Sequence, residues 1–190
     1  MVTGYKHKLV DAFLSTTFPY HNISTVYNSN FYKSVIYSIK KGFENINTSD
    51  PVLLLNGDTY YDKDIFRQAI ELSHQDYDTI TLFGHIMNKS YNDDMLINVI
   101  DSKMLNVGKD LKKSNGVSSG AILMCNGGLR KYLNTINSKP IDKLKTHHSI
   151  LQFISDSGFD IDFVNLDSRN WLEIDKLEDL DHARGYFANN

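Results

Sequence analysis

The hydrophobic pattern of the chain alternates between short apolar runs and longer stretches with a helical period. The run VLLL at residues 52–55 has no helical period and stops at Asn56-Gly57. Such a run is typical of a strand in a sheet that helices cover on both faces. Further strands are expected at residues 23–28, 79–84, 120–124, 160–166 and 171–174. Residues 95–100 and 104–109 flank Asp101-Ser102-Lys103, which predicts a hairpin.

Apolar residues at helical spacing predict helices between these strands. A short amphipathic helix is expected at residues 8–14. A second helix, in the segment after residue 28, should bury Phe31, Val35, Ile36 and Ile39. The helix that Asp62 would cap has a predicted buried face of Ile65, Phe66, Ala69, Ile70 and Leu72. A helix that starts at His147 should end at Gly158, and the last helix should bury Leu177, Leu180, Ala183 and Phe187. The predicted class is α/β, with a mostly parallel mixed sheet, flanking helices and a small β-hairpin insertion, in a single domain over residues 1–190.

The composition fits a soluble globular domain. The chain has 190 residues, of which 41% are hydrophobic, and this is enough to build a core. A net charge of -3 and a pI near 6.1 give no general attraction to nucleic acid or to an anionic membrane. The single cysteine, Cys125, excludes an internal disulfide and a cysteine-cluster metal site. No apolar run approaches the ~20 residues that span a bilayer, so a cytoplasmic location is expected.

Two aspartates each stand between a predicted strand and a helix. Asp58 follows the VLLL run, and Asp175 follows the WLEI run. Two such acids can share one Mg²⁺, because this ion prefers oxygen ligands and is commonly held by one or two carboxylates together with substrate phosphates. Helix capping is the alternative, since Asp175 and Glu178 have the spacing of a capping box. Asp58 fits capping less well, because Asp62 is the better cap.

Several segments, in order, resemble the nucleoside-triphosphate transferases that activate sugar phosphates and small phosphoesters. LLLNGDTYYD resembles their metal-binding strand, WLEIDKLEDLDHA their closing segment, and MLINVIDSKMLNVGKDLKKSNGVSSGAILM their hairpin. GYKHKLVDAF is similar to the end of their second strand and the helix after it. The resemblance spans essentially the whole chain and is strongest to the cytidylyltransferase branch, which includes phosphocholine cytidylyltransferases. It implies a Rossmann-like fold.

The resemblance implies a reaction and a set of site residues. An acceptor phosphate oxygen would attack the α-phosphorus of a nucleoside triphosphate, with CTP favoured, and release pyrophosphate. Asp58 and Asp175 would hold Mg²⁺. Lys109 would face the small phosphorylated acceptor or the developing charge, and Glu173 would contact the acceptor; a solvated lysine and a surface strand residue are the alternatives. Trp171 is expected in the core.

The resemblance also implies nucleotide contacts at the start of the chain. Asn28, Ser38 and Gly57 would lie near the nucleotide, with ordinary cap or turn roles as the alternative for Asn28 and Ser38. The pair His147-His148 has no partner at metal-ligand spacing, so a position on a helix surface is expected.

The sequence departs from the family at its beginning. These enzymes open with a strand and a glycine-rich loop that cradles the triphosphate, whereas the chain starts at MVTGYK, and its 190 residues contain no such loop. A truncated form with little transferase activity is therefore expected. Without that strand, the VLLL strand would keep an unpaired edge, which invites aggregation or pairing with another chain.

Two other functions remain open from the sequence. A glycosyltransferase with a related metal-binding fold would use Asp58 or the acidic stretch Asn92-Asp93-Asp94 to hold a nucleotide-sugar. A degenerate, non-catalytic domain would bind a metabolite or a partner without converting it.

Overall fold

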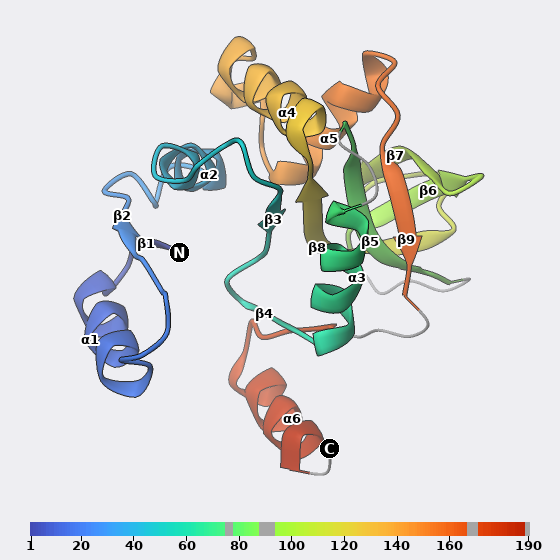
Figure 1. The fold of residues 1–190 in the computed structure, drawn as a ribbon. Coiled ribbons are helices and arrows are strands. Elements are labelled where there is room, and N and C mark those ends of the chain that lie inside the picture. The colour runs from blue at the N-terminus through green and yellow to red at the C-terminus, as the bar shows by residue number, and fades with distance from the viewer. Residues whose placement is uncertain (75–77, 88–93, 167–170, 189–190) are drawn as a thin grey trace.

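The computed structural model describes residues 1–74, 78–87, 94–166 and 171–188, with side chains up to residue 185, and all structural statements refer to these residues. Three layers make up its main part, with a six-stranded sheet between several helices on one face and a single helix on the other (Figure 1). The order of strands in the sheet is β3 (Val52–Leu54), β8 (Gly116–Met124), β5 (Ile80–Ile86), β9 (Asp162–Asn165), β7 (Lys103–Gly108) and β6 (Leu96–Ile100).

The sheet is mixed, and part of it closes into a ring. β5 and β9 are parallel, whereas β8 is antiparallel to both of its long-range neighbours, β3 and β5. The first residues of β8 also pair with β6, so that β6, β7, β9, β5 and β8 form a closed set. Antiparallel pairs are therefore more numerous than the sequence pattern suggested, because β8 continues from the hairpin and runs between two strands of the opposite direction.

Two small sheets lie outside this ring. β1 (Val2–Thr3) and β2 (Val26–Tyr27) are parallel, and β4 (Thr59–Tyr61) is antiparallel to β10 (Trp171–Glu173). In Figure 1 the β1–β2 pair lies on the far side of a space from β3, and the β4–β10 pair lies at the lower end of β3. The β4–β10 pair thus carries the chain segment that contains Asp58 and Asp175.

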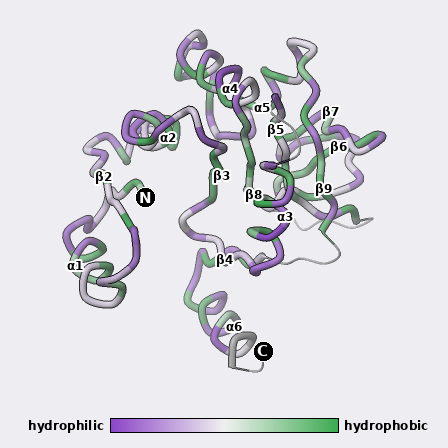
Figure 2. The backbone as a smooth tube through the Cα atoms, viewed as in Figure 1, coloured by the Kyte–Doolittle hydropathy of each residue, from purple (hydrophilic) through white to green (hydrophobic). Residues whose placement is uncertain are grey.

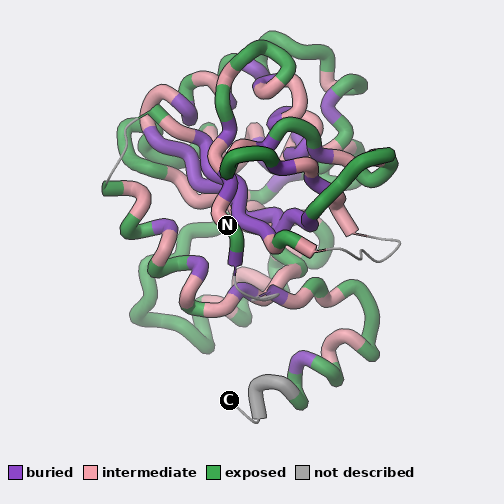
Figure 3. Tube along the Cα trace, turned by 90° about the vertical axis from the view of Figure 1, so that its right-hand side faces the viewer, coloured by how far each residue is buried: buried purple, intermediate pink, exposed green. Residues whose placement is uncertain are grey.

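Both faces of the central sheet are apolar, as expected for a sheet between helices. Along β3, Val52 and Leu54 pack on one core cluster, and Leu53 and Leu55 pack on the other. The first cluster is covered by α2 (Val35–Phe43), α4 (Asn126–Ser138) and α5 (His147–Asp156); the second is covered by α3 (Lys63–Ser73). Figures 2 and 3 show hydrophobic and buried backbone concentrated in these strands.

The hairpin and most helices lie where the sequence pattern placed them. Asp101 and Ser102 form the two-residue turn between β6 and β7, and both have positive φ, at 49° and 59°. This is the twist that favours tight hairpins. Asp62 caps α3 by accepting a hydrogen bond from the Asp64 N–H at 2.9 Å. A 3₁₀ turn at Ile141–Lys143 precedes α5.

The predicted buried faces of two helices need correction. In α3, Phe66 is 40% exposed and Ile70 60% exposed, whereas Ile65 and Ala69 are buried and Leu72 packs against the same core cluster. In α2, Phe31 lies outside the helix and Val35 is exposed.

The terminal helices are more exposed than the pattern indicates. In α6 (Leu177–Ala188), Leu177 is 79% exposed while Ala183 is buried, and the side chain of Phe187 lies outside the described residues. α1 (His7–Thr17) has no buried residue. None of the described helices is long and apolar enough to cross a membrane.

Candidate active site

The pairing of β4 with β10 brings the two predicted acids to one place. Glu173 lies opposite Thr59 in this pair, and the Ile174 N–H donates to the Asp58 carbonyl oxygen at 2.8 Å. Asp58 immediately precedes β4, and Asp175 lies two residues beyond the end of β10. Their backbones therefore meet at one end of the small sheet, as the two-acid hypothesis requires.

The electrostatics of Glu173 reveal a concentration of negative charge at this end. Partial burial raises the pKa of Glu173, and the carboxylates of Asp175, Asp58 and Asp94 raise it further. Among the described residues, Lys109 opposes this effect. Three carboxylates and one lysine are thus close enough to influence Glu173, and a bound cation would relieve the repulsion that acts on it.

The capping alternative for Asp175 is not supported. The backbone N–H groups of Asp175 and Lys176 donate to the Asp179 carboxylate, at 3.0 and 2.8 Å. Asp179 therefore reaches back to the backbone that precedes α6, and no helix N–H among the described residues donates to the Asp175 carboxylate, as a capping residue requires. The carboxylate of Asp58 has a single long contact, from the Thr59 hydroxyl at 3.4 Å. Both carboxylates are exposed and retain free acceptor capacity.

Behind the acids lies a polar layer that connects them to the centre of β8. The Tyr61 hydroxyl donates to the Ser119 carbonyl oxygen at 3.0 Å and accepts from the Asn56 N–H at 3.2 Å. Gly120 has a φ of +78°, and a Cβ on this residue would lie 2.6 Å from the Asn56 amide nitrogen. These contacts fix the segment between β3 and β4, which includes Gly57 and Asp58.

The pair His147-His148 is buried, so its predicted position on a helix surface is wrong. The first turn of α5 faces the core, and the two rings lie 3.9 Å apart. The His148 Nε2 lies 2.8 Å from the Ser118 hydroxyl, whereas the His147 Nε2 is buried without a hydrogen-bond partner.

One acid of the site, Asp58, also affects the pKa of His147. Burial lowers the pKa of His147 to about 4, and the nearby Asp58 partly opposes this shift. At neutral pH its imidazole is therefore uncharged. Apolar residues follow at positions 150, 151 and 154. This was the sequence signal that could have predicted a buried position for the first turn of α5.

The residues predicted to contact the nucleotide fall into two places. Asn28 is buried, donates to the Ser38 hydroxyl at 3.0 Å, and accepts from the Asn30 N–H at 2.9 Å. This pair lies beside β2 and α2, apart from β4 and β10 (Figure 1). Gly57 directly precedes Asp58, and no atom lies within 4 Å of the position a Cβ would take. The structure therefore unites Gly57, but not Asn28 and Ser38, with the acids.

The structure also gives the positions of Lys109, Trp171 and the acidic stretch at residues 92–94. Lys109 follows β7 and is exposed, and Trp171 packs in the second core cluster rather than facing solvent. Asn92 and Asp93 lie outside the described residues, while Asp94 is half-buried.

The described residues fit a metal ion that relies on its substrate for ligands. They contain no group of three or more His, Cys, Asp or Glu side chains arranged to hold a metal. Two carboxylates at one sheet end do suit Mg²⁺, because this ion usually keeps waters and takes further oxygens from substrate phosphates.

The fold is similar to that of solved nucleotidyltransferases. The inositol-1-phosphate CTP transferase from T. maritima matches 94% of this chain with 70% of its own, at a TM-score of 0.73 and 17% identity. The CTP:phosphocholine cytidylyltransferase from Streptococcus pneumoniae matches 98% of this chain with 76% of its own, at a TM-score of 0.71 and 18% identity.

A third similar structure is named for nucleotide-sugars rather than for CTP. The nucleoside-diphosphate-sugar pyrophosphorylase from Vibrio cholerae matches 95% of this chain with 78% of its own, at a TM-score of 0.69 and 9% identity. No protein-family model and no curated protein sequence matches the chain. At these identities the likeness establishes the fold alone, and it confirms the predicted α/β class.

Proposed function

We propose that the chain carries the metal-binding carboxylates of a nucleotidyltransferase site. The reaction at this site transfers a nucleotidyl group from a nucleoside triphosphate to a small phosphorylated acceptor. The meeting of Asp58 and Asp175 through the β4–β10 pairing carries this proposal. The fold supports this proposal, since solved proteins with a similar fold are described as nucleotidyltransferases. CTP is the favoured donor because two of those names specify it.

Asp58 and Asp175 would hold Mg²⁺ through their exposed carboxylates. When bound, this ion would neutralise phosphate charge and align the triphosphate for in-line displacement. The nucleophile is already an anion, so the protein needs no general base of the Ser-His-Asp type. The protein has to bind two negatively charged substrates, the nucleoside triphosphate and the phosphorylated acceptor, next to its own carboxylates.

Lys109 is placed to contribute positive charge to this task. It is exposed, and it lies close enough to Glu173 to lower the pKa of that carboxyl. We assign it to the acceptor phosphate or to the charge that develops on the displaced pyrophosphate. Glu173 would then face the uncharged or cationic part of the acceptor, because a carboxylate repels phosphate.

Acceptor-dependent product formation tests the proposal directly. The suitable experiment is a transfer assay with radiolabelled CTP, protein at stoichiometric concentration, Mg²⁺, and a panel of phosphocholine, inositol phosphate and glucose-1-phosphate. Labelled product that depends on the acceptor is expected. Asp58→Asn should lower its formation at least a hundredfold, whereas Asp62→Asn, which keeps the cap of α3, should change it less than twofold.

Two further measurements on the same protein, with a nucleotide-sugar as substrate and of nucleotide binding with and without Mg²⁺, separate the competing functions. Release of a sugar from a nucleotide-sugar, without acceptor-dependent transfer from CTP, would indicate a glycosyltransferase-like reaction instead. Mg²⁺-dependent nucleotide binding without any product would indicate a non-catalytic domain. Product formation that survives Asp58→Asn would contradict the assignment of the site itself.

A further inference from the structure

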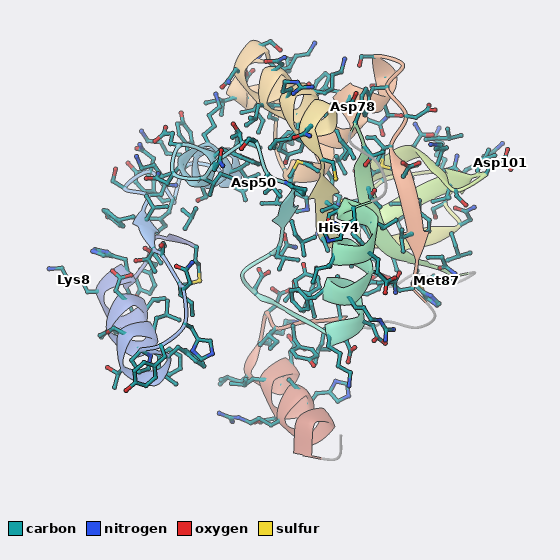
Figure 4. All side chains as sticks on the ribbon, in the orientation of Figure 1. Lys8, Asp50, His74, Asp78, Met87 and Asp101 are labelled. Carbon is teal, nitrogen blue, oxygen red and sulfur yellow. The ribbon has the colours of Figure 1, made fainter. Side chains whose placement is uncertain are left out.

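A bulge interrupts the pairing of β8 with β5. Positions 82 and 84 of β5 lie opposite positions 122 and 118 of β8, so a single residue of β5 faces three residues of β8. These three are Ser119, Gly120 and Ala121. They are buried, and side chains of the neighbouring elements surround this part of the sheet (Figure 4). Bulges turn a strand locally and take backbone groups out of the ladder, and they are common next to active sites.

Two serine hydroxyls satisfy the backbone groups that the bulge releases. The Ser118 Oγ accepts from the Gly120 N–H at 3.0 Å. The Ser119 Oγ accepts from the Ala121 N–H at 3.2 Å and donates to the Phe83 carbonyl oxygen at 2.8 Å. Because buried N–H and C=O groups without partners are costly, these hydrogen bonds stabilise the bulged form of β8.

His148 holds one of these two serines from the opposite side. It lies in the first turn of α5, and its Nε2 is 2.8 Å from the Ser118 hydroxyl, with both side chains buried. Burial lowers the pKa of His148 well below its ordinary value, so the ring is uncharged at neutral pH. The hydroxyl and the neutral ring can each donate or accept, so a hydrogen bond joins them in either tautomer.

The bulge also determines where β3 leaves the sheet. β3 pairs with β8 as far as Leu54, which lies opposite Ile122, and the next residue of β8 in this direction belongs to the bulge. Just beyond this point Asn56 meets Gly120, since a Cβ on Gly120 would lie 2.6 Å from the Asn56 amide nitrogen. Asp58 follows two residues later. The path of the chain into Asp58 therefore depends on the shape of the bulge.

We propose that His148 is a positioning residue of the site, which acts through Ser118 and the bulge of β8 to fix the backbone that carries the Asp58 carboxylate. The proposal rests on the function proposed above, because it takes Asp58 as a metal ligand. The ring of His148 is buried and would touch neither metal nor substrate. Replacing a residue that orients a metal ligand commonly lowers metal affinity or activity by roughly 10–100-fold.

Positioning and simple structural support predict different behaviour in suitable variants. His148→Phe keeps an aromatic ring but removes the hydrogen bond to Ser118, whereas His148→Gln keeps a polar group close to the place of Nε2. The Nδ1 of His148 has no hydrogen-bond partner among the described residues, so an apolar ring should cost little stability. Loss of metal binding without loss of stability would therefore indicate positioning.

A matched control comes from the same core. Tyr132→Phe also removes a buried polar atom, the hydroxyl of Tyr132, for which the described part of the chain provides no hydrogen-bond partner. Tyr132 lies in α4 and has no contact with the bulge through this hydroxyl, so the variant should leave metal binding unchanged.

The test combines a metal-free and a metal-dependent measurement on the full chain. The amide ¹H–¹⁵N resonances of Gly57 and Asp58 should move in His148→Phe and in Ser118→Ala, and stay in place in Tyr132→Phe. Binding of Mn²⁺ in the presence of CTP, followed by electron paramagnetic resonance, should weaken about tenfold in His148→Phe and in Ser118→Ala. His148→Gln should restore the affinity to within threefold of the wild type.

The two measurements fail in different ways. Resonances of Gly57 and Asp58 that are unchanged in both His148→Phe and Ser118→Ala would overturn the proposal, and so would equally weakened Mn²⁺ binding in the Tyr132→Phe control. If the wild type bound no Mn²⁺ with CTP, the proposed function would fail, and the resonances alone would decide whether His148 positions Asp58.

Discussion

At the scale of single residues, the buried imidazoles next to the acid cluster are the main surprise. Adjacent histidines at the start of a helix suggest an exposed polar pair, but α5 turns its first residues inward, where His148 reaches Ser118 on β8. Burial lowers the pKa of both rings. A sequence pattern cannot indicate this, because it depends on a partner 30 residues away in the chain.

Because His147 is buried with a lowered pKa, the folded protein should lose stability as the pH falls. The pKa of His147 is about 4 when folded and 6.5 in the unfolded reference, so the unfolded chain binds more protons between these values. The free energy of unfolding should therefore fall as pH drops from about 6.5 to about 4, by on the order of 3 kcal/mol from this residue.

Urea unfolding of the wild type and of His147→Gln at pH 7.5 and pH 4.5 measures this effect. The variant should lose clearly less stability than the wild type over that range. An equal loss in both proteins would show that His147 is accessible to protons in the folded state.

Glu173 provides a second prediction at this scale. Its folded pKa is raised, first by partial burial and then by Asp175, Asp58 and Asp94. Its stabilising influence is therefore greatest below its ordinary pKa and is lost as pH rises through the raised value. At pH 7 without metal, Glu173→Gln should raise the thermal midpoint by about 1–3 °C. Glu71→Gln, on the exposed face of α3, should not, and a midpoint lowered by Glu173→Gln would contradict the charge repulsion.

At the scale of elements, the predicted strands and the hairpin are largely confirmed because their signals are local. The VLLL run, the Asp101-Ser102 turn and the Asp62 cap are all visible in a few consecutive residues. The helix α4 was not predicted, because it begins with Asn126-Gly127-Gly128, which reads as a turn. Gly128 is needed there because a Cβ would lie 2.0 Å from the Thr79 carbonyl oxygen.

The faces of α3 and α6 were predicted less well for a different reason. Helical spacing predicts an apolar stripe but not how much of it another element covers. Phe66, Ile70 and Leu177 continue their stripes beyond the contact with the sheet and remain exposed.

Gly120 links element geometry to the site. Its positive φ and its contact with Asn56 hold β8 against the segment that precedes Asp58. Gly120→Ala should lower the free energy of unfolding by about 1–3 kcal/mol, measured by urea unfolding. Gly185→Ala in α6, where no atom of the described residues lies within 4 Å of the Cβ position, is the control in a helix with negative φ and should be neutral or slightly stabilising. If both variants were equally stable, the strain at Gly120 would be refuted.

At the scale of the whole molecule, the sheet is divided between a closed main part and the separate β1–β2 pair. The acids belong to the β4–β10 pair at the end of β3, while Asn28 and Ser38 belong to the other part. The sequence could predict Asp58 and Asp175 because each follows a strand. It could not predict the β4–β10 pairing through which they meet, since this pairing joins segments that are far apart in the chain.

The central claim is that Asp58 and Asp175 bind one divalent ion together with a nucleoside triphosphate. Its most direct test is electron paramagnetic resonance of Mn²⁺ in place of Mg²⁺, with CTP labelled with ¹⁷O at its phosphates. We predict a bound Mn²⁺ whose lines are broadened by the labelled phosphates, with binding at least tenfold weaker in Asp58→Asn and in Asp175→Asn. Binding unchanged by either substitution, or no phosphate broadening, would contradict the account.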